Sequence, residues 1–353
     1  MPKNIIKLFI EKNGFITVED FMKKALIGSS NAYYKSRNPF DKKSGDFITS
    51  PEISQMFGEI VAVWVYNRWL FMGTPKSLSL VELGAGSGIL MRDILRVLSK
   101  TEIFHGLKIY ILEINPVLVA IQQNELKDYL NNIVWISNAQ EFPEDHSIYI
   151  ANEFFDSLPT KQYIKQDGLW HERVITLNDG DLFFGTIQVD PRFSKRLSEK
   201  YKNTKDGSIV EISQETIRYF TKMIRNMSRF KSCGLVIDYG YYIKPLKRKE
   251  HEFKDSLQAV KSHKYCPVFD DIGRADITTH VDFFLLRECS HFYDINSKIW
   301  SQRDFLLKHG MEIRLKDLAK KNPEYKDVLE NQFSRLTDKG SMGGLFKVLE
   351  VYS

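Results

Sequence analysis

Apolar residues between positions 78 and 151 follow two alternating patterns, one typical of strands and one typical of helices. Short apolar runs predict buried strands at 78–83, 107–112, 133–136 and 147–151. Helical spacing follows the first two runs, and Pro116 stands in the first turn of the second helix. Strands that alternate with helices are typical of a parallel, doubly wound α/β sheet. Because ligands of such sheets bind beyond the carboxyl ends of the strands, the residues after each strand are the functional candidates.

The pattern changes after residue 160. Three strand-like runs separated by Asp-Gly pairs predict an inserted β-meander at 161–190, and a helical stretch follows at 211–230. Apolar runs at 235–240, in "HFYDINSKIW" and in "GLFKVLEVY" predict the strands that complete a seven-stranded sheet. We therefore expect a helical N-terminal lid region at 1–77 and one α/β domain at 78–353 with an insertion at about 161–232.

The stretch "SLVELGAGSGILMRDIL", residues 79–95, joins the first strand to its helix through a glycine-rich turn. Glycine lets the backbone turn sharply and approach a ligand at the helix N-terminus. A P-loop is excluded because no Gly-Lys-Ser/Thr ends the turn, and a dinucleotide loop is disfavoured because its third glycine would come one residue later. The remaining pattern, Glu82, Gly84, Gly86 and Gly88, resembles the first motif of class I S-adenosylmethionine-dependent methyltransferases. A dinucleotide site and a turn without ligand stay open as alternatives.

Polar residues follow the next two predicted strands. Glu113 is placed to accept hydrogen bonds from both ribose hydroxyls of an adenosine cofactor. Asn138 is placed to read the adenine amine, with Ala139 beside the ring. The alternative for Glu113 is a surface glutamate at a helix start, and the alternative for Asn138 is a polar turn.

After the fourth strand comes "ANEFFDSLP", residues 151–159, where reacting groups lie in class I methyltransferases. It contains Asn152 but lacks the prolines typical of amide and base N-methyltransferases. Instead, Glu153 and Asp156 flank two phenylalanines. Paired carboxylates suit a planar, cationic guanidinium acceptor, which aromatic faces can stack against. In the alternative reading, Glu153 lies on the cofactor side and Asp156 caps a helix.

The segment "TSPEIS", residues 49–54, predicts a helix start with Thr49 or Ser50 as its cap and Pro51 in its first turn. Glu52 would then lie near the glycine-rich turn as part of a lid, or the segment is a helix start without ligand contact. His280 and Asp282 lack a third metal ligand, so we expect no metal site. Tyr239 and the 280–282 segment are instead expected to line the acceptor pocket.

Bulk properties narrow the function further. The 50 basic and 45 acidic residues are mixed along the chain, and the net charge of +5 is too small to indicate nucleic-acid binding. No apolar run has the length of a membrane span, and the N-terminus lacks the features of a signal peptide. Three cysteines without metal-type spacing fit a reducing compartment. We expect a bacterial cytoplasmic enzyme.

Several motifs together are similar to the MidA family, which includes the mitochondrial complex I assembly factor and its bacterial relatives. They occur in order along nearly the whole chain: "GDFITSPEISQMFGE" at 45–59, "ANEFFDSLPTKQ" at 151–162, "WHERV" at 170–174, "LVIDYGY" at 235–241, "DITTHVDF" at 276–283 and "MGGLFKVL" at 342–349. The resemblance implies a class I methyltransferase sheet with a helical lid and an inserted β-region. It also implies protein arginine methylation on a complex I subunit, with S-adenosylmethionine as cofactor.

The resemblance assigns roles to particular residues. The implied cofactor loop is Glu82 with its three glycines, the implied ribose acid is Glu113, and the remaining implied site residues are Asn152, Glu153, Asp156, Thr49, Ser50, Pro51, Glu52 and Ser54. Many relatives have "GPGRG" where this chain has "GAGSG", and the segment at 242–256 is longer and more basic than the family pattern. A non-catalytic assembly factor that keeps the fold, and an NAD-dependent oxidoreductase, are the alternative functions.

Overall fold

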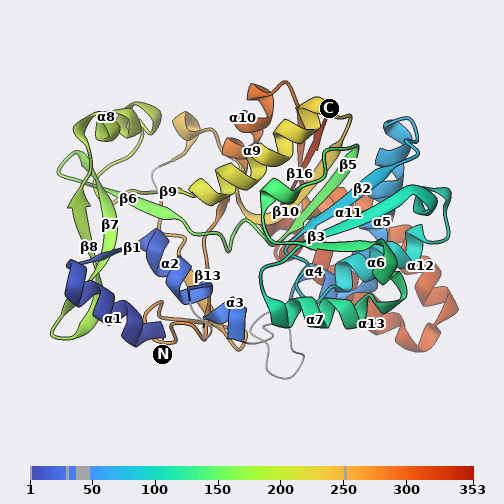
Figure 1. The fold of residues 1–353 in the computed structure, drawn as a ribbon, viewed down its shortest axis with the longest axis horizontal. Helices are drawn as coiled ribbons and strands as arrows, with labels where there is room; N and C mark the ends of the chain where they lie inside the picture. Colours follow the sequence, from blue (N-terminus) through green and yellow to red (C-terminus); the bar gives the residue numbers. More distant parts are fainter. Residues whose placement is uncertain (1, 29–31, 37–47, 250–252) are drawn as a thin grey trace. The chain divides into compact units, whose positions relative to one another are not determined.

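The computed structural model describes residues 2–28, 32–36, 48–249 and 253–353 (Figure 1). Residue contacts divide the chain into two compact units. The first comprises Met1–Phe47, Asp156–Arg218 and Tyr242–His280, and the second comprises Ile48–Phe155, Tyr219–Tyr241 and Val281–Ser353. Residues 45–47 of the N-terminal motif and 250–252 of the basic segment lie outside the described residues.

The second unit is organised around a mixed sheet. Its strands are β2 (Leu78–Leu83), β3 (Leu107–Leu112), β4 (Ile133–Ile136), β5 (Ser147–Asn152), β10 (Cys233–Tyr241), β15 (Asn296–Ser301) and β16 (Phe346–Tyr352). They run in the order β15-β16-β10-β5-β2-β3-β4, and the short β14 (Val281–Asp282) pairs with β10 outside this path. The strands from β10 to β4 are parallel, whereas β16 is antiparallel to both β10 and β15. The predicted α/β sheet of seven strands is thereby confirmed.

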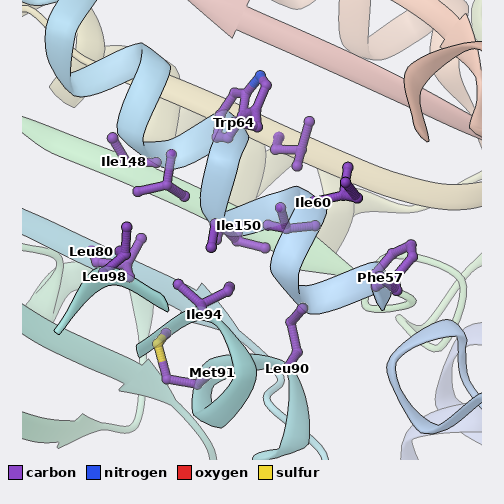
Figure 2. Close-up of a cluster of buried hydrophobic side chains, with 14 of the residues drawn as sticks. Phe57, Ile60, Trp64, Leu80, Leu90, Met91, Ile94, Leu98, Ile148 and Ile150 are labelled. Atoms are coloured by element: carbon purple, nitrogen blue, oxygen red, sulfur yellow. The ribbon is translucent and has the colours of Figure 1, made fainter. Parts of the chain in front are cut away.

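Helices pack on this sheet because its strands are apolar on both faces, and every residue of β2 is buried. Figure 2 shows α5 (Gln55–Phe71) and α6 (Ile89–Leu98) meeting strands β2 and β5. Their contact is made by Phe57, Ile60, Trp64, Leu80, Leu90, Met91, Ile94, Leu98, Ile148 and Ile150, none more than 3% exposed. Burial of each large apolar side chain stabilises the fold by about 1.5–3 kcal/mol, so this layer holds the glycine-rich turn in place.

The other helices of the second unit are α4 (Ser50–Ile53), α7 (Pro116–Glu125), α10 (Phe283–Phe292), α11 (Gln302–Lys308), α12 (Met311–Lys321), α13 (Lys326–Thr337), α14 (Met342–Leu345) and most of α9 (Gln214–Arg229). Short 3-10 helices occur at η1 (Glu102–Gly106), η2 (Lys127–Asn132) and η3 (Ala139–Glu141). Among the described residues, no helix is both long and apolar enough to cross a lipid bilayer.

The first unit contains two small sheets. The larger consists of β1 (Ile16–Thr17), β6 (Lys161–Gln166), β7 (Leu169–Asn178), β8 (Asp181–Gln188) and β9 (Ile209–Ile212), and the smaller of β11 (Gln258–Lys261), β12 (Lys264–Cys266) and β13 (Asp276–Thr278). Its helices are α1 (Pro2–Asn13), α2 (Val18–Leu26), α3 (Tyr33–Ser36) and α8 (Pro191–Lys200), with the 3-10 turn η4 (Pro245–Lys247). The predicted β-meander is confirmed as β6, β7 and β8, and both of its Asp-Gly turns have positive φ angles.

Other expectations differ from the structure in detail. The stretch at 211–230 was expected to be helical throughout, but Ile209–Ile212 forms β9, because it pairs with β6, and the helix begins only at Gln214. Helix α8 and the three-stranded sheet were not predicted. The compact units also do not follow the predicted boundary at residue 77, since α5 contacts α6 and groups with the sheet unit.

Candidate functional site

The glycine-rich turn between β2 and α6 has a backbone that favours glycine. Gly84, Gly86 and Gly88 have φ angles of +69°, +54° and +86°, in the left-handed region that other residues rarely adopt. A Cβ atom on Gly84 would lie 2.7 Å from Cδ2 of Phe154. The amide of Gly84 donates to the carbonyl of Leu112 at 3.0 Å, which ties the turn to the end of β3. The turn therefore brings bare backbone to the carboxyl ends of the parallel strands.

Glu82 lies at the base of this turn, near the end of β2. Its side chain is 2% exposed, and its Oε2 atom has no hydrogen-bond partner among the described residues. Burial, together with the negative charge of Glu113, raises the pKa of Glu82 to about 8. A buried acceptor without a partner is costly, so this atom is suited to a donor supplied by a ligand.

Glu113 follows β3, as predicted. Its Oε1 accepts hydrogen bonds from the amides of Ile114 at 2.9 Å and Asn115 at 2.8 Å. Its Oε2 accepts from Nε2 of Gln122 at 3.2 Å. Burial raises the pKa of Glu113, and these hydrogen bonds oppose the rise. The carboxylate is thus held in one orientation by donors from the start of α7.

Gln122 was missed by the sequence reasoning. It lies on α7 and is fully buried. Besides Glu113, its Nε2 contacts the carbonyl of Gly86 at 2.9 Å, and its Oε1 accepts from the indole of Trp135 at 2.9 Å. The available signal was its spacing, since it stands four residues after Leu118 and four before Leu126, both buried.

Asn138 follows β4, as predicted, but its amide is engaged locally. Its Oδ1 accepts from the amide of Gln140 at 2.9 Å and caps η3, while its Nδ2 donates to Glu141 and, at 3.2 Å, to Ser137. These contacts are those of a polar turn. A role in reading adenine stays a prediction.

Glu153 follows β5 and is connected to α4. Its φ angle is +52°, which is strained for a residue with a side chain. Its Oε1 accepts from the amide of Ser50 and from Nδ2 of Asn152, both at 3.1 Å. The Oδ1 atom of Asn152 is buried and has no hydrogen-bond partner within the described part of the chain. The end of β5 therefore presents a carboxylate that holds the start of α4 and an amide oxygen that is available to a ligand.

Helix α4 reaches the glycine-rich turn through Glu52. Its N-cap is Thr49, and Pro51 stands in its first turn, as predicted. Glu52 accepts from the amide of Thr49 at 3.4 Å through Oε2 and from the Ser87 hydroxyl at 3.3 Å through Oε1. The structure thus places the predicted lid segment against the turn.

The remaining candidates, Asp156 and Tyr239, have other contacts. Asp156 is the first residue of its segment in the first unit, is 6% exposed, and accepts a hydrogen bond from the amide of Thr279 at 2.9 Å through its backbone carbonyl. Tyr239 packs against Phe346 in the second unit, with ring centroids 5.6 Å apart. No group of three or more potential metal ligands occurs among the described residues. Hydrogen bonds therefore connect the glycine-rich turn to Glu52 and, through Gln122, to Glu113, and they connect Glu153 to Asn152 and the start of α4. Glu153 and Asp156 belong to different compact units.

Known proteins resemble this chain over most of its length. Residues 60–297 match the model of a family described as "Putative S-adenosyl-L-methionine-dependent methyltransferase". The chain is 31% identical over 97% of its length, and 83% of the relative's, to the mitochondrial protein arginine methyltransferase NDUFAF7 homolog of Drosophila melanogaster. It is 30% identical to protein arginine methyltransferase NDUFAF7 of Danio rerio, over 99% of its length and 87% of the relative's.

A solved structure supports the fold. A likely methyl transferase of the COG1565 superfamily from Burkholderia thailandensis, bound to S-adenosyl-homocysteine, superposes with a TM-score of 0.87 at 22% identity. The match covers 100% of this chain and 92% of that one. The class I methyltransferase fold expected from the sequence is therefore confirmed. Because the family model matches residues 60–297, which is more than half of the chain, the chain belongs to that family of S-adenosyl-L-methionine-dependent methyltransferases.

Proposed function

We propose that this protein transfers a methyl group from S-adenosylmethionine to a guanidino nitrogen of an arginine in a protein, with a subunit of respiratory complex I as the substrate. The observation that carries the proposal is the similarity to relatives named protein arginine methyltransferases, which extends over 97–99% of the chain. The resemblance to the MidA family supports the choice of a complex I subunit as the substrate. The reducing compartment indicated by the cysteines supports a bacterial cytoplasmic location, which fractionation of native cells would test.

The residues of the second unit fit S-adenosylmethionine. The left-handed glycines leave the backbone of the turn without side chains, and the buried Oε2 of Glu82 and Oδ1 of Asn152 are acceptors suited to the donors of an amino acid moiety. Glu113 would hold the ribose and Asn138 the adenine. Thr49, Pro51 and Glu52 would cover the site from α4. When bound, S-adenosylmethionine supplies an activated methyl group on a sulfonium.

The protein's own contribution is positioning and charge. We propose that Glu153 and Asp156 orient the guanidinium of the acceptor by charge-assisted hydrogen bonds, and that one of them accepts the proton released by the transfer. Because the arginine guanidinium stays charged in proteins, the acceptor enters as a cation, and its proton leaves as the new N–C bond forms. Catalysis then depends on holding the acceptor nitrogen about 3–3.5 Å from the methyl carbon.

Transfer of label tests this function directly. Purified protein is incubated with methyl-labelled S-adenosylmethionine and the complex I subunit, and the labelled amino acid is identified after hydrolysis. We expect methylarginine, and we expect Glu153→Gln and Asp156→Asn to slow single-turnover transfer by about 100-fold or more while S-adenosylhomocysteine affinity changes little. Binding of S-adenosylhomocysteine without any transfer would instead indicate an assembly factor, and binding of NAD an oxidoreductase. If only the Glu153 variant loses cofactor affinity, Glu153 lies on the cofactor side and Asp156 alone keeps the acceptor role.

A further inference from the structure

We infer that Gln122 is a positioning residue for cofactor binding, because one buried amide fixes both the ribose acid Glu113 and the backbone of Gly86. This inference rests on the proposed function, since it concerns the same cofactor site. Gln122 does not need to touch the cofactor. It acts through two groups that we assign to cofactor binding.

The contacts of Gln122 determine the orientation of its amide. The indole nitrogen of Trp135 can only donate, so the atom 2.9 Å from it must be the oxygen, Oε1. The amide nitrogen therefore faces the carbonyl of Gly86 at 2.9 Å and Oε2 of Glu113 at 3.2 Å. Its two hydrogens are matched by these two acceptors, and the side chain is 0% exposed.

These contacts constrain what Glu113 can offer a ligand. Oε1 already accepts two backbone hydrogen bonds, from Ile114 and Asn115, so its lone pairs are occupied. Within the described part of the chain, Oε2 accepts only from Gln122 and keeps one further acceptor position. The direction of the Gln122 bond thus sets which side of Oε2 faces a ribose hydroxyl. The same amide holds the carbonyl of Gly86, so the glycine-rich turn and the ribose acid keep one relative position.

Gln122→Leu tests the role of the two donors, with Gln123→Leu as matched control. Gln123 is the next residue on α7 and is exposed. Because hydrogen bonds to charged groups are among the stronger ones in proteins, we expect Gln122→Leu to bind S-adenosylhomocysteine about 10-fold or more weakly by calorimetry. The control should bind like the wild type. In a double-mutant cycle with Glu113→Gln, the loss caused by Gln122→Leu should shrink by about threefold or more, because its partner is already altered. Additive losses would overturn the inference.

A pH profile separates positioning from a merely structural role. Gln122→Glu places a second carboxyl beside Glu113, and a buried pair of carboxyls retains a proton at low pH that can replace one amide hydrogen. Charged groups on the adjoining elements are Glu82 on β2, Glu52 on α4 and the Arg92–Glu125 ion pair between α6 and α7. All of them are common to the control Gln123→Glu. We therefore expect the affinity ratio of wild type to Gln122→Glu to rise about threefold or more between about pH 6 and pH 9, and to stay flat for the control.

The outcomes distinguish this inference from the proposed function. A wild-type protein that does not bind S-adenosylhomocysteine would overturn both. A wild-type protein that binds, together with a folded Gln122→Leu variant of unchanged affinity, would overturn only the inference. If Gln122→Leu does not fold, Trp135→Phe takes its place in the cycle, because it removes the indole donor to Oε1 and keeps an aromatic ring. Unchanged affinity in that variant, with a flat pH ratio for Gln122→Glu, would also overturn it.

Discussion

Gly84→Ala should both destabilise the fold and weaken cofactor binding, for reasons that can be worked from the structure. The alanine would have to keep a φ angle of +69°. Its methyl group would lie 2.7 Å from Cδ2 of the Phe154 ring. The left-handed conformation costs about 1–2 kcal/mol for a residue with a side chain. The ring must also shift, which disturbs its edge contacts with Phe155 and Tyr219 at 5.3 and 5.5 Å. Each such contact is worth about 0.5–1.5 kcal/mol, so we expect a total loss of about 2–5 kcal/mol in the free energy of unfolding.

Gly73→Ala is the matched control, because it isolates the backbone cost. Gly73 has a φ of +89°, and no atom lies within 4 Å of the position of an added Cβ. We expect the control to lose only about 1–2 kcal/mol and to bind S-adenosylhomocysteine like the wild type. Gly84→Ala should bind it about 10-fold or more weakly, since the turn must rearrange around the displaced ring. Calorimetry and chemical unfolding measure the two quantities. A Gly84→Ala protein that binds as tightly as Gly73→Ala would refute the reasoning.

Three further outcomes follow from the structure. Gly86→Val should abolish S-adenosylmethionine binding in a folded protein, because a branched side chain strongly disfavours a φ of +54°, and calorimetry showing unchanged affinity would contradict this. Burial raises the pKa of Glu82 to about 8, so the ligand-free folded state binds this proton more tightly than the unfolded chain and loses stability as pH rises from about 5 to 8. Glu82→Gln should therefore gain stability relative to the wild type over that window. A difference in unfolding free energy that does not change with pH would count against this. Arg314→Met should cost about 1–3 kcal/mol in unfolding free energy, because buried Glu59 loses hydrogen bonds of 2.7 and 2.9 Å. Lys316→Met removes an exposed ion pair and should cost less than about 0.5 kcal/mol. Equal losses in the two variants would disprove a stabilising role for the hydrogen bonds to Glu59.

The parts of the fold that could be predicted are those encoded in neighbouring residues. The strands of the large sheet are continuous apolar runs, and the turns of the meander are Asp-Gly pairs, so local pattern was sufficient. Strand β9 was missed because its four residues precede a helix directly, and only pairing with distant β6 makes them a strand. The grouping of residues 242–280 with the first unit likewise depends on contacts far apart in sequence.

The site shows the same division between local and distant causes. The pattern predicted that Glu113, Asn152 and Glu153 lie at the carboxyl ends of the strands, because chain direction in a parallel sheet determines where such residues lie. Sequence could not show that Glu153 holds the amide of Ser50, since that contact joins residues 103 positions apart. Gln122 was missed for a similar reason: a glutamine on a helix is ordinarily solvated, and only the tertiary structure buries it.

The place of β16 in the sheet has a consequence for how the protein is made. The groups that we assign to the cofactor lie at the ends of β2, β3 and β5, all in the first half of the chain. Yet Phe346–Tyr352 pairs with β10 on one side and β15 on the other, inside the sheet rather than at its edge. While the chain is still being synthesised, β10 has an open edge that can pair with other chains. The sheet is complete only after residue 352 has been added, so a nascent chain must keep that edge protected until then.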